Sequence, residues 1–467
     1  MPGANYLLLR DSTGVRTMFA THIRRDFGVK ENYQSHRVRQ ALVIIGVSTL
    51  VQWPICGVPV AIGLTLLLVV IAIVWASPAG RPLGVLLFWP SVINWVCHPF
   101  DIYGAGFFLL IPLASLLLIP VWSSVVRTWR AIPHWVLLSG LGLISWWFVS
   151  WMIGPRTDWG TLKLFASVSR LVIGAFALSV CMRAKRNTFL EVAVIGLTVG
   201  AFLFAVNCQK CPLSSFGFGV WKELEAEAEA VVGPRAMGLA VVIQFAFAII
   251  LSERHFLALV GLTLVCAAPT MIVSDSRQML LGIPLALSCL LVQKASRHRA
   301  VVALGPIVVV VGALAAYGFA VQHYRYTIFL DNTKSFSERI WRSEAWEAGI
   351  DTWRKSPLFG VGLGGYNKDS EHFGRGYPHN LFIEMLAETG LVGFVLGIGF
   401  LISCWATILQ SQRAWVRKDF MMVLSMWAYC FLIAMVSLDI PGNIEVFYFP
   451  AAAILGVKAS NKFPRYA

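Results

Sequence analysis

Charged residues are scarce in this sequence. Asp, Glu, Lys and Arg make up 13% of its 467 residues, whereas hydrophobic residues make up 57% and the mean hydropathy is +0.71. Too little polar sequence separates the apolar runs for a soluble domain. A membrane β-barrel would need short strands with alternating apolar and polar residues, whereas these runs repeatedly reach the roughly 20 residues of a membrane-spanning helix. The sequence therefore predicts an all-α fold, a polytopic transmembrane helical bundle.

Two kinds of chemical motif are also missing. No group of His, Cys and carboxylate residues has the spacing of metal ligands, and no Asp-x-Asp pair is present to hold a divalent cation beside a phosphate. We therefore expect no metal and no cofactor, and phosphate chemistry would need arginines to balance the charge. The first forty residues also lack a cleavable signal pattern.

The charge that is present is positive and dispersed. The net charge is +14, from 38 basic and 24 acidic residues. The basic residues fall in short clusters between apolar runs and not on one soluble domain, so we expect no nucleic-acid partner. With the N-terminus in the cytoplasm, these clusters fall on the cytoplasmic side, as the positive-inside rule requires. Both termini are therefore predicted to be cytoplasmic, with the basic N-terminal tail on anionic membrane lipid.

Hydropathy predicts about 12 to 14 spans. They are placed at residues 41–56, 58–76, 83–98, 104–124, 133–151, 163–182, 189–207, 235–251, 256–273, 278–293, 300–320, 390–410, 420–438 and 445–457. The predicted organisation is a cytoplasmic tail over 1–40, a transmembrane bundle over 41–320 with an extracytoplasmic loop at 207–234, a large extracytoplasmic catalytic loop with interfacial helices over 321–389, C-terminal spans over 390–457, and a cytoplasmic tail over 458–467.

Of the nine cysteines, two fall in a predicted extracytoplasmic loop, Cys208 and Cys211. These two could form a disulfide in an oxidising compartment. A thioredoxin-like redox role would need a strand pattern that does not surround the pair. The other seven have the character of small apolar residues within spans.

The stretch from residue 376 to residue 400, GYPHNLFIEMLAETGLVGFVLGIGF, begins polar and continues without a break into an apolar span. Its first half is therefore expected at a membrane surface. Pro378 suits the first turn of a helix, where a backbone N–H is not needed. His379 and Asn380 are accordingly predicted at the helix N-terminus.

His379 is the candidate base of this stretch. A second positive charge is disfavoured beside the positive end of a helix dipole, so the imidazole should resist protonation. A neutral imidazole can accept a proton. After it, Asn380, Glu384 and Glu388 recur every four residues and form one polar stripe. The alternative is that His379 is only a polar cap where a helix enters the interface.

Arginines provide the candidate anion site. Arg277, in SDSRQ, lies at an extracytoplasmic span end, where it could bind an anion at headgroup depth or serve only as an interfacial anchor. Arg339 and Arg342, in SFSERIWRSEAW, lie about one turn apart on a predicted helix and could instead form a solvated face. Arg170 is different because it lies mid-span, where a charge is unfavourable and marks a function or a buried partner.

The segment PLFGVGLGGY, residues 357–366, has a glycine spacing that loosely matches a dinucleotide-binding loop. Such a loop needs a preceding strand and a following helix in a cytoplasmic βαβ unit, and this segment follows a helical stretch on the opposite side of the membrane. The two interpretations that remain are a turn whose backbone N–H groups face a phosphate, with Gly362 as a contact, and a plain linker turn.

Taken in order, Arg277, then Arg342 followed by Trp346, then PLFGVGLGGY, then PHNLFIEMLAETGLVG resemble the O-antigen ligase and polymerase superfamily of bacterial polysaccharide assembly. The shared features are a small polar residue before an Arg, an Arg four residues before a Trp, a Pro-Leu-x-Gly-x-Gly turn, and His-Asn with a Glu and a Glu-x-Gly along one helix. The resemblance covers roughly the last half of the chain, and the first half is similar only in having many spans.

The resemblance implies a metal-independent glycosyltransferase of the bacterial inner membrane, with its active site facing the periplasm and a glycan on undecaprenyl diphosphate as donor. Arg277 and Arg342 would bind the diphosphate, and His379 would activate the acceptor hydroxyl as general base. Arg235, in GPRAMG, resembles a further family position, although the Pro-Asn that often follows is absent here. The remaining predicted substrate-binding residues are Arg339, Asn380, Glu384 and Gly362.

The motifs do not define the acceptor. A ligase would move the glycan to lipid A-core or another acceptor, whereas a polymerase would join repeat units into a growing O-antigen or exopolysaccharide. A transporter of the lipid-linked glycan, with Arg170 as its intramembrane charge, would have internal repeats and broken helices, and the sequence indicates neither. A non-catalytic assembly partner would not need arginines and a histidine gathered on one face. We therefore expect a ligase-like enzyme, with a polymerase as the alternative.

Overall fold

The computed structural model describes residues 59–97, 105–130, 132–184, 188–210, 239–243, 333–366, 377–410, 418–435 and 439–462. Four predicted spans lie wholly outside these residues, namely 41–56, 256–273, 278–293 and 300–320. The predicted loop at 207–234 is described only as far as residue 210, so Cys211 also lies outside the described residues.

Every regular element within the described residues is helical, which confirms the all-α prediction. Three helices are long and apolar enough to cross a membrane: α6 (His134–Ile153), α7 (Asp158–Arg183) and α16 (Leu381–Gln410). Shorter apolar helical stretches are Leu66–Trp75, Ile111–Val126, Thr188–Gly200 and Met422–Ala434. These helices coincide with predicted spans because a long apolar segment can satisfy its backbone groups in lipid only as a helix.

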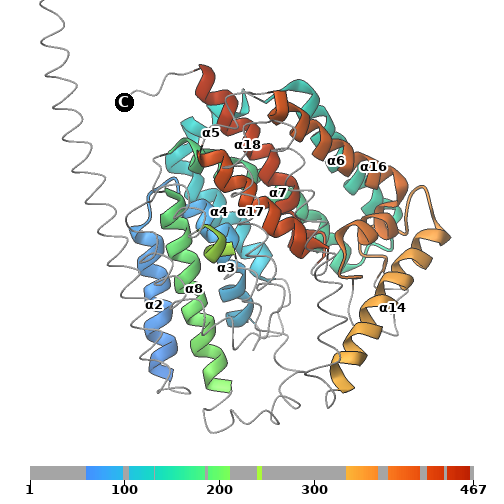
Figure 1. Ribbon diagram of the computed structural model, residues 1–467, viewed down its shortest axis with the longest axis horizontal. Helices are drawn as coiled ribbons and strands as arrows, with labels where there is room; N and C mark the ends of the chain where they lie inside the picture. The colour runs from blue at the N-terminus through green and yellow to red at the C-terminus, as the bar shows by residue number, and fades with distance from the viewer. Residues whose placement is uncertain are drawn as a thin grey trace, which may run out of the picture.

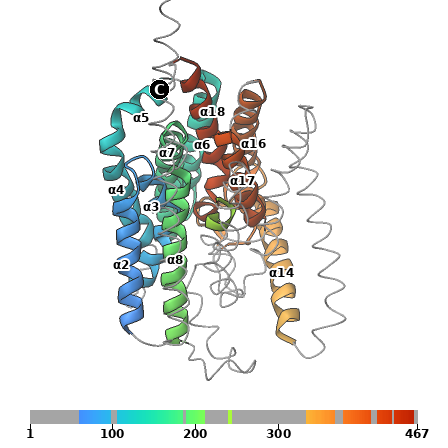
Figure 2. The same cartoon turned by 60° about the vertical axis from the view of Figure 1, so that its left-hand side comes forward.

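Helix α7 lies at the centre of the described bundle. The helices α3, α4 and α8 pack on one side of it and α6 and α18 on the other, while α2 packs on α8, α16 on α6 and α17 on α18 (Figures 1 and 2). The bounds of the elements not yet given are α2 (Pro59–Trp75), α3 (Arg81–Cys97), α4 (Ala105–Leu118), η3 (Ile119–Val121), α5 (Trp122–Trp129), α8 (Thr188–Lys210), α14 (Thr333–Lys355), α17 (Lys418–Ala434), η5 (Pro441–Asn443) and α18 (Glu445–Lys462).

Polar side chains on α7 have partners within the protein. The helix begins earlier than the predicted span 163–182, because Thr157 Oγ1 accepts a hydrogen bond from the Gly160 N–H and caps it. Further along, the Arg170 guanidinium donates to the Glu445 carboxylate on α18 at 2.6 Å and to the Pro441 carbonyl. This buried ion pair is the partner that an intramembrane charge requires.

Helix α16 is broken, contrary to the expectation of a continuous stretch. Gly390 has φ 67° and ψ −172°, and this separates residues 381–389 from residues 391–410. That backbone conformation is essentially restricted to glycine. A broken helix was the feature expected of a transporter, and within the described residues α16 is where one occurs.

The segment 357–366 fills this break. It exchanges backbone hydrogen bonds with both parts of α16, so the groups freed by Gly390 are satisfied inside the protein. Irregular backbone at membrane depth is tolerated under that condition. The bonds run from the Leu391 N–H to Pro357 O, from the Val392 N–H to Leu358 O, from the Val361 N–H to Ala387 O and from the Gly362 N–H to Glu388 O, at 2.9 to 3.1 Å.

Candidate active site

Asn380 caps helix α16. Its Oδ1 accepts hydrogen bonds from the N–H groups of Phe382 and Ile383 at 3.0 and 3.1 Å, and its Nδ2 donates to the Met435 carbonyl at 3.0 Å. The helix begins at the next residue, so the prediction that Pro378 lies in its first turn is wrong. The physical reason is that the asparagine amide satisfies two helix N–H groups that otherwise have no partner.

His379 is held in an unusual backbone conformation just before this cap. Its φ is 56°, in the left-handed region that non-glycine residues rarely adopt, and this costs about 1–2 kcal/mol. The side chain is 7% exposed, and its ring centre lies 4.4 Å from that of Tyr377. Strain of this kind persists where the surrounding structure fixes it, and such positions cluster at functional sites.

Helix α14 lies against the start of α16 (Figure 1). Gly349 provides the close approach, because a Cβ there would meet the side chains of Pro378 and Ile383. One turn further back along α14, the Ala345 carbonyl accepts a hydrogen bond from Tyr366 Oη at 3.0 Å. The first contact fixes α14 against the segment that carries the histidine, and the second fixes it against segment 357–366.

The predicted arginines are placed only in part. Arg339 and Arg342 lie on α14, which confirms the helix expected there. Arg342 is one turn before Ala345, on the helix that packs beside the histidine segment. The side chains of both arginines lie outside the described residues, as do Arg277 and Arg235 altogether.

Tyr366 is a neutral hydrogen-bond donor in this arrangement. Burial, together with the nearby charges of Glu384 and Glu388, raises the pKa of Tyr366 to about 12, against an opposing contribution from Lys163. The phenol therefore keeps its proton at neutral pH and donates it to α14.

The glycines of segment 357–366 serve close packing. Gly362 has φ 90°, and a Cβ there would overlap Gly154 at the turn between α6 and α7. Gly364 approaches Gly160 in the same way. The N–H groups that a phosphate would need already donate to carbonyl groups of the protein, at Gly360, Val361, Gly362 and Gly365. The segment is therefore a packed connection between α6, α7 and α16, and neither a phosphate-facing turn nor a plain linker describes it.

Lys163 is the residue that sequence reasoning missed. Its Nζ donates to the Glu384 carboxylate at 2.6 Å and to the Glu388 carboxylate at 2.7 Å, and all three side chains are 0% exposed. The polar stripe of α16 therefore faces α7, and Glu384 is engaged in an ion pair. A lysine at the start of an apolar span, beside a span with two glutamates one turn apart, was the available signal.

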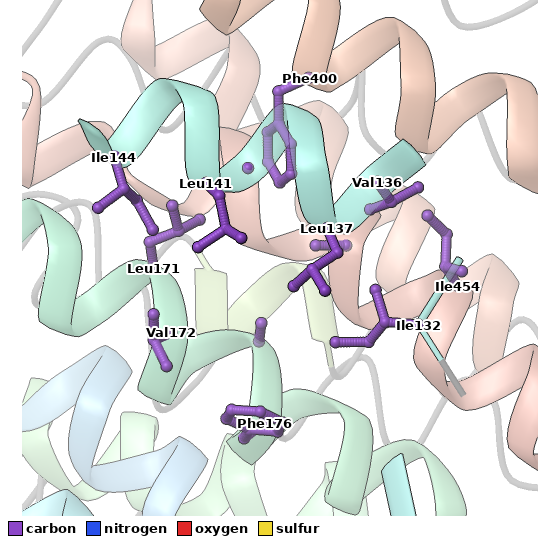
Figure 3. A pocket seen from close by; sticks show the side chains of 13 residues that line it. Ile132, Val136, Leu137, Leu141, Ile144, Leu171, Val172, Phe176, Phe400 and Ile454 are labelled. Atoms are coloured by element: carbon purple, nitrogen blue, oxygen red, sulfur yellow. The ribbon is translucent and has the colours of Figure 1, made fainter. Parts of the chain in front are cut away.

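An apolar cavity of about 120 Å³ lies between α6, α7, α16 and α18 (Figure 3). Its lining includes Leu141, Val172, Phe400 and Ile454 and contains no titratable side chain. On helix α16 it lies well beyond the break, at the level of Phe400. It is therefore not part of the proposed chemical site.

A comparison with protein families finds that residues 262–398 match the family model described as O-antigen ligase. The matched segment contains α14, segment 357–366, His379 and the break at Gly390. No curated protein matches the chain. The match confirms the resemblance that the sequence motifs indicate.

Proposed function

Because residues 262–398 belong to the O-antigen ligase superfamily, we propose that this protein is a glycosyltransferase that moves a glycan from undecaprenyl diphosphate to an acceptor hydroxyl. The family match supports a membrane enzyme that transfers glycosyl groups and uses lipid-linked polysaccharide substrates. The proposal adds the donor, the independence from metal ions, and a site on the periplasmic face of the bacterial inner membrane.

The observation that carries the proposal is the setting of His379. A buried imidazole in a strained backbone conformation lies directly before the capped end of α16, and α14, which carries Arg339 and Arg342, packs against the same segment. Candidate base and candidate anion-binding helix are thus adjacent. This supports acid–base chemistry beside a phosphate group.

In the proposed reaction, His379 takes the proton of the acceptor hydroxyl as its oxygen bonds to the anomeric carbon of the glycan. The bond between that carbon and the diphosphate oxygen breaks, and undecaprenyl diphosphate leaves with the electron pair. Arg277 and Arg342 would stabilise its charge through charge-assisted hydrogen bonds, each worth about 1.5–3 kcal/mol. A positioned base contributes about 10²–10⁴-fold.

The other predicted substrate-binding residues divide into two groups. We propose that Arg339 assists Arg342 on α14 and that Arg235 has a secondary role at the anion. The polar groups of Asn380, Glu384 and Gly362 are engaged within the protein. Their proposed contribution is therefore to shape the site.

The test is to incubate the purified protein with an undecaprenyl-diphosphate-linked glycan, with and without lipid A-core, and to size the products. A ligase yields glycan on lipid A-core and no longer chains. Polymer growth without added core would identify a polymerase.

One observation favours the transporter alternative, namely the break in helix α16 at Gly390. The transporter alternative predicts that the intact lipid-linked glycan moves across the membrane of vesicles that contain the protein. If the incubations with and without lipid A-core also formed no new glycosidic bond, the enzyme proposal would be contradicted.

A further inference from the structure

The first part of α16 needs contacts from other elements to keep its position. Residues 381–389 are separated from the rest of the helix by Gly390. A helix shorter than about 12–15 residues is only marginally stable alone. Residue 379 precedes this short part directly, so the position of its imidazole depends on whatever holds residues 381–389 in place.

Lys163 provides two of those contacts. Its ammonium binds Glu384 and Glu388, which lie one turn apart, and so it ties two successive turns of this part to α7. Segment 357–366 holds the same part from another direction, through the bonds to Ala387 and Glu388.

The charge balance of this cluster is unusual. Two carboxyl groups face one ammonium with all three side chains 0% exposed, and the charge of Asp439 also acts on Lys163. Tyr366 is the other titratable group that interacts with the cluster, and its phenol is neutral. Among the described residues, the second oxygen of each glutamate, Oε2, has no hydrogen-bond partner. Since an uncompensated buried charge is strongly unfavourable, both carboxyl groups depend on the Lys163 ammonium as their charge partner.

We infer that Lys163 is a positioning residue, which fixes the first part of α16, and with it His379, through its ion pairs to Glu384 and Glu388. The inference rests on the proposed function for its catalytic consequence. The structural consequence, that removal of the cluster frees residues 381–389, is independent of the proposed function.

The test variant is Lys163→Met/Glu384→Gln/Glu388→Gln in the full-length protein. It removes all three ionisable groups of the cluster together, and the Asp439 carboxylate keeps its hydrogen bond from the Gly442 N–H, so we expect the fold to be retained. The matched control is Arg170→Met/Glu445→Gln, which removes the other buried ion pair of α7. Both are purified by size exclusion and assayed for transfer from the undecaprenyl-diphosphate glycan and for backbone amide exchange.

For the triple variant we expect kcat at least about 10-fold lower, because small displacements of a reacting group have effects of this size. KM for the donor stays within about 2-fold, and amides of residues 381–389 exchange faster. The control keeps wild-type kcat per folded molecule and wild-type exchange in residues 381–389. Wild-type kcat and exchange in the triple variant would overturn the inference.

The single variant Glu384→Gln keeps the test decisive if the triple variant does not fold. It retains the ion pair between Lys163 and Glu388, with one positive and one negative charge, so we expect it to fold. Its loss of kcat should be smaller than that of the triple variant, and the amides of residues 381–389 should exchange faster than in the wild type. Unchanged kcat and exchange there would also overturn the inference. Failure of the proposed function can be told apart from failure of this inference. If the proposed function is wrong, the wild type shows no transfer, but amide exchange in residues 381–389 still shows whether Lys163 holds this part of α16.

Discussion

At the scale of single residues, the sequence motif around position 379 predicts a histidine at a helix start, and the structure adds how it is held. Asn380, and not Pro378, makes the cap, and His379 itself takes a left-handed conformation. The identities of these residues could be read from the sequence. The backbone conformation could not, because a left-handed φ at a non-glycine residue persists only where tertiary packing fixes it, and the sequence does not reveal that packing.

The first residue-scale prediction concerns the arginines of α14. Arg342→Ala should lose transfer activity while the protein still inserts, since Arg342 is proposed to bind the diphosphate and not to hold the fold. Arg339 lies one turn away and can take over part of the pairing, so the decisive variant is Arg339→Ala/Arg342→Ala. Full activity in that double variant would rule out the assignment.

Arg354 provides the matched control on the same helix. It forms an exposed ion pair with Asp351 at 2.8 Å, and such pairs contribute little. Arg354→Ala should therefore leave transfer unchanged in the same assay.

The second residue-scale prediction concerns Tyr366. Its pKa is raised to about 12 by burial and the neighbouring carboxylates, so its contribution to stability is fully present below pH 10 and is lost as pH rises towards 12. The difference in tyrosinate absorbance between wild type and Tyr366→Phe should be absent at pH 10.5. A full tyrosinate signal from Tyr366 at that pH would contradict its burial against α14.

At the scale of elements, hydropathy places helices where the described residues have them, but it does not reveal that α16 is two helices. The polar first half of the stretch leads directly into the span predicted at 390–410 with no turn signal between them, so the sequence alone predicts continuity. The break depends on the backbone of segment 357–366, which reaches α16 from an earlier part of the chain. The glycines of that segment were visible in the sequence, but their role in close packing becomes apparent only with Gly154 and Gly160 beside them.

The element-scale prediction is that Gly390→Ala is strongly destabilising. Its backbone conformation is nearly exclusive to glycine, and a Cβ would overlap the Leu358 carbonyl. We expect a loss of about 1–3 kcal/mol or more, because strain and overlap add.

Gly399→Ala is the control within the same helix, since a Cβ there meets no atom within 4 Å and the residue is helical. It should be neutral or slightly stabilising. Melting temperatures in detergent measure both variants, and equal melting temperatures would contradict the described break.

At the scale of the whole molecule, the all-α fold follows from the apolar runs, while the pairing of helices does not. Lys163 and Glu384 are far apart in sequence, and so are Arg170 and Glu445. Side chains that pair across such distances carry no local signal beyond the rarity of charge in spans. For this reason the sequence singles out Arg170 without its partner and does not single out Lys163.

The whole-molecule prediction is that transfer persists after treatment with a chelator. The sequence offers no carboxylate cluster suited to a hard cation, so arginines are proposed to balance the diphosphate charge. The measurement is the transfer rate in detergent before and after chelation. A strict requirement for Mg²⁺ or Mn²⁺ would contradict the proposal and direct attention to Asp275, in SDSRQ, as a ligand, since Lys163 already binds Glu384 and Glu388.

The central claim is that His379 is the general base of a glycosyl transfer. It is tested most directly by the transfer rates of His379→Ala and His379→Gln beside donor binding, with His134→Gln on α6 as an exposed control. We predict that both His379 variants lose about 10²–10⁴-fold in rate and still bind donor, because glutamine cannot take up a proton at working pH. The wild-type rate should fall as pH is lowered and the imidazole becomes protonated. A His379→Gln variant with near wild-type turnover would contradict the claim and show that His379 only orients the acceptor.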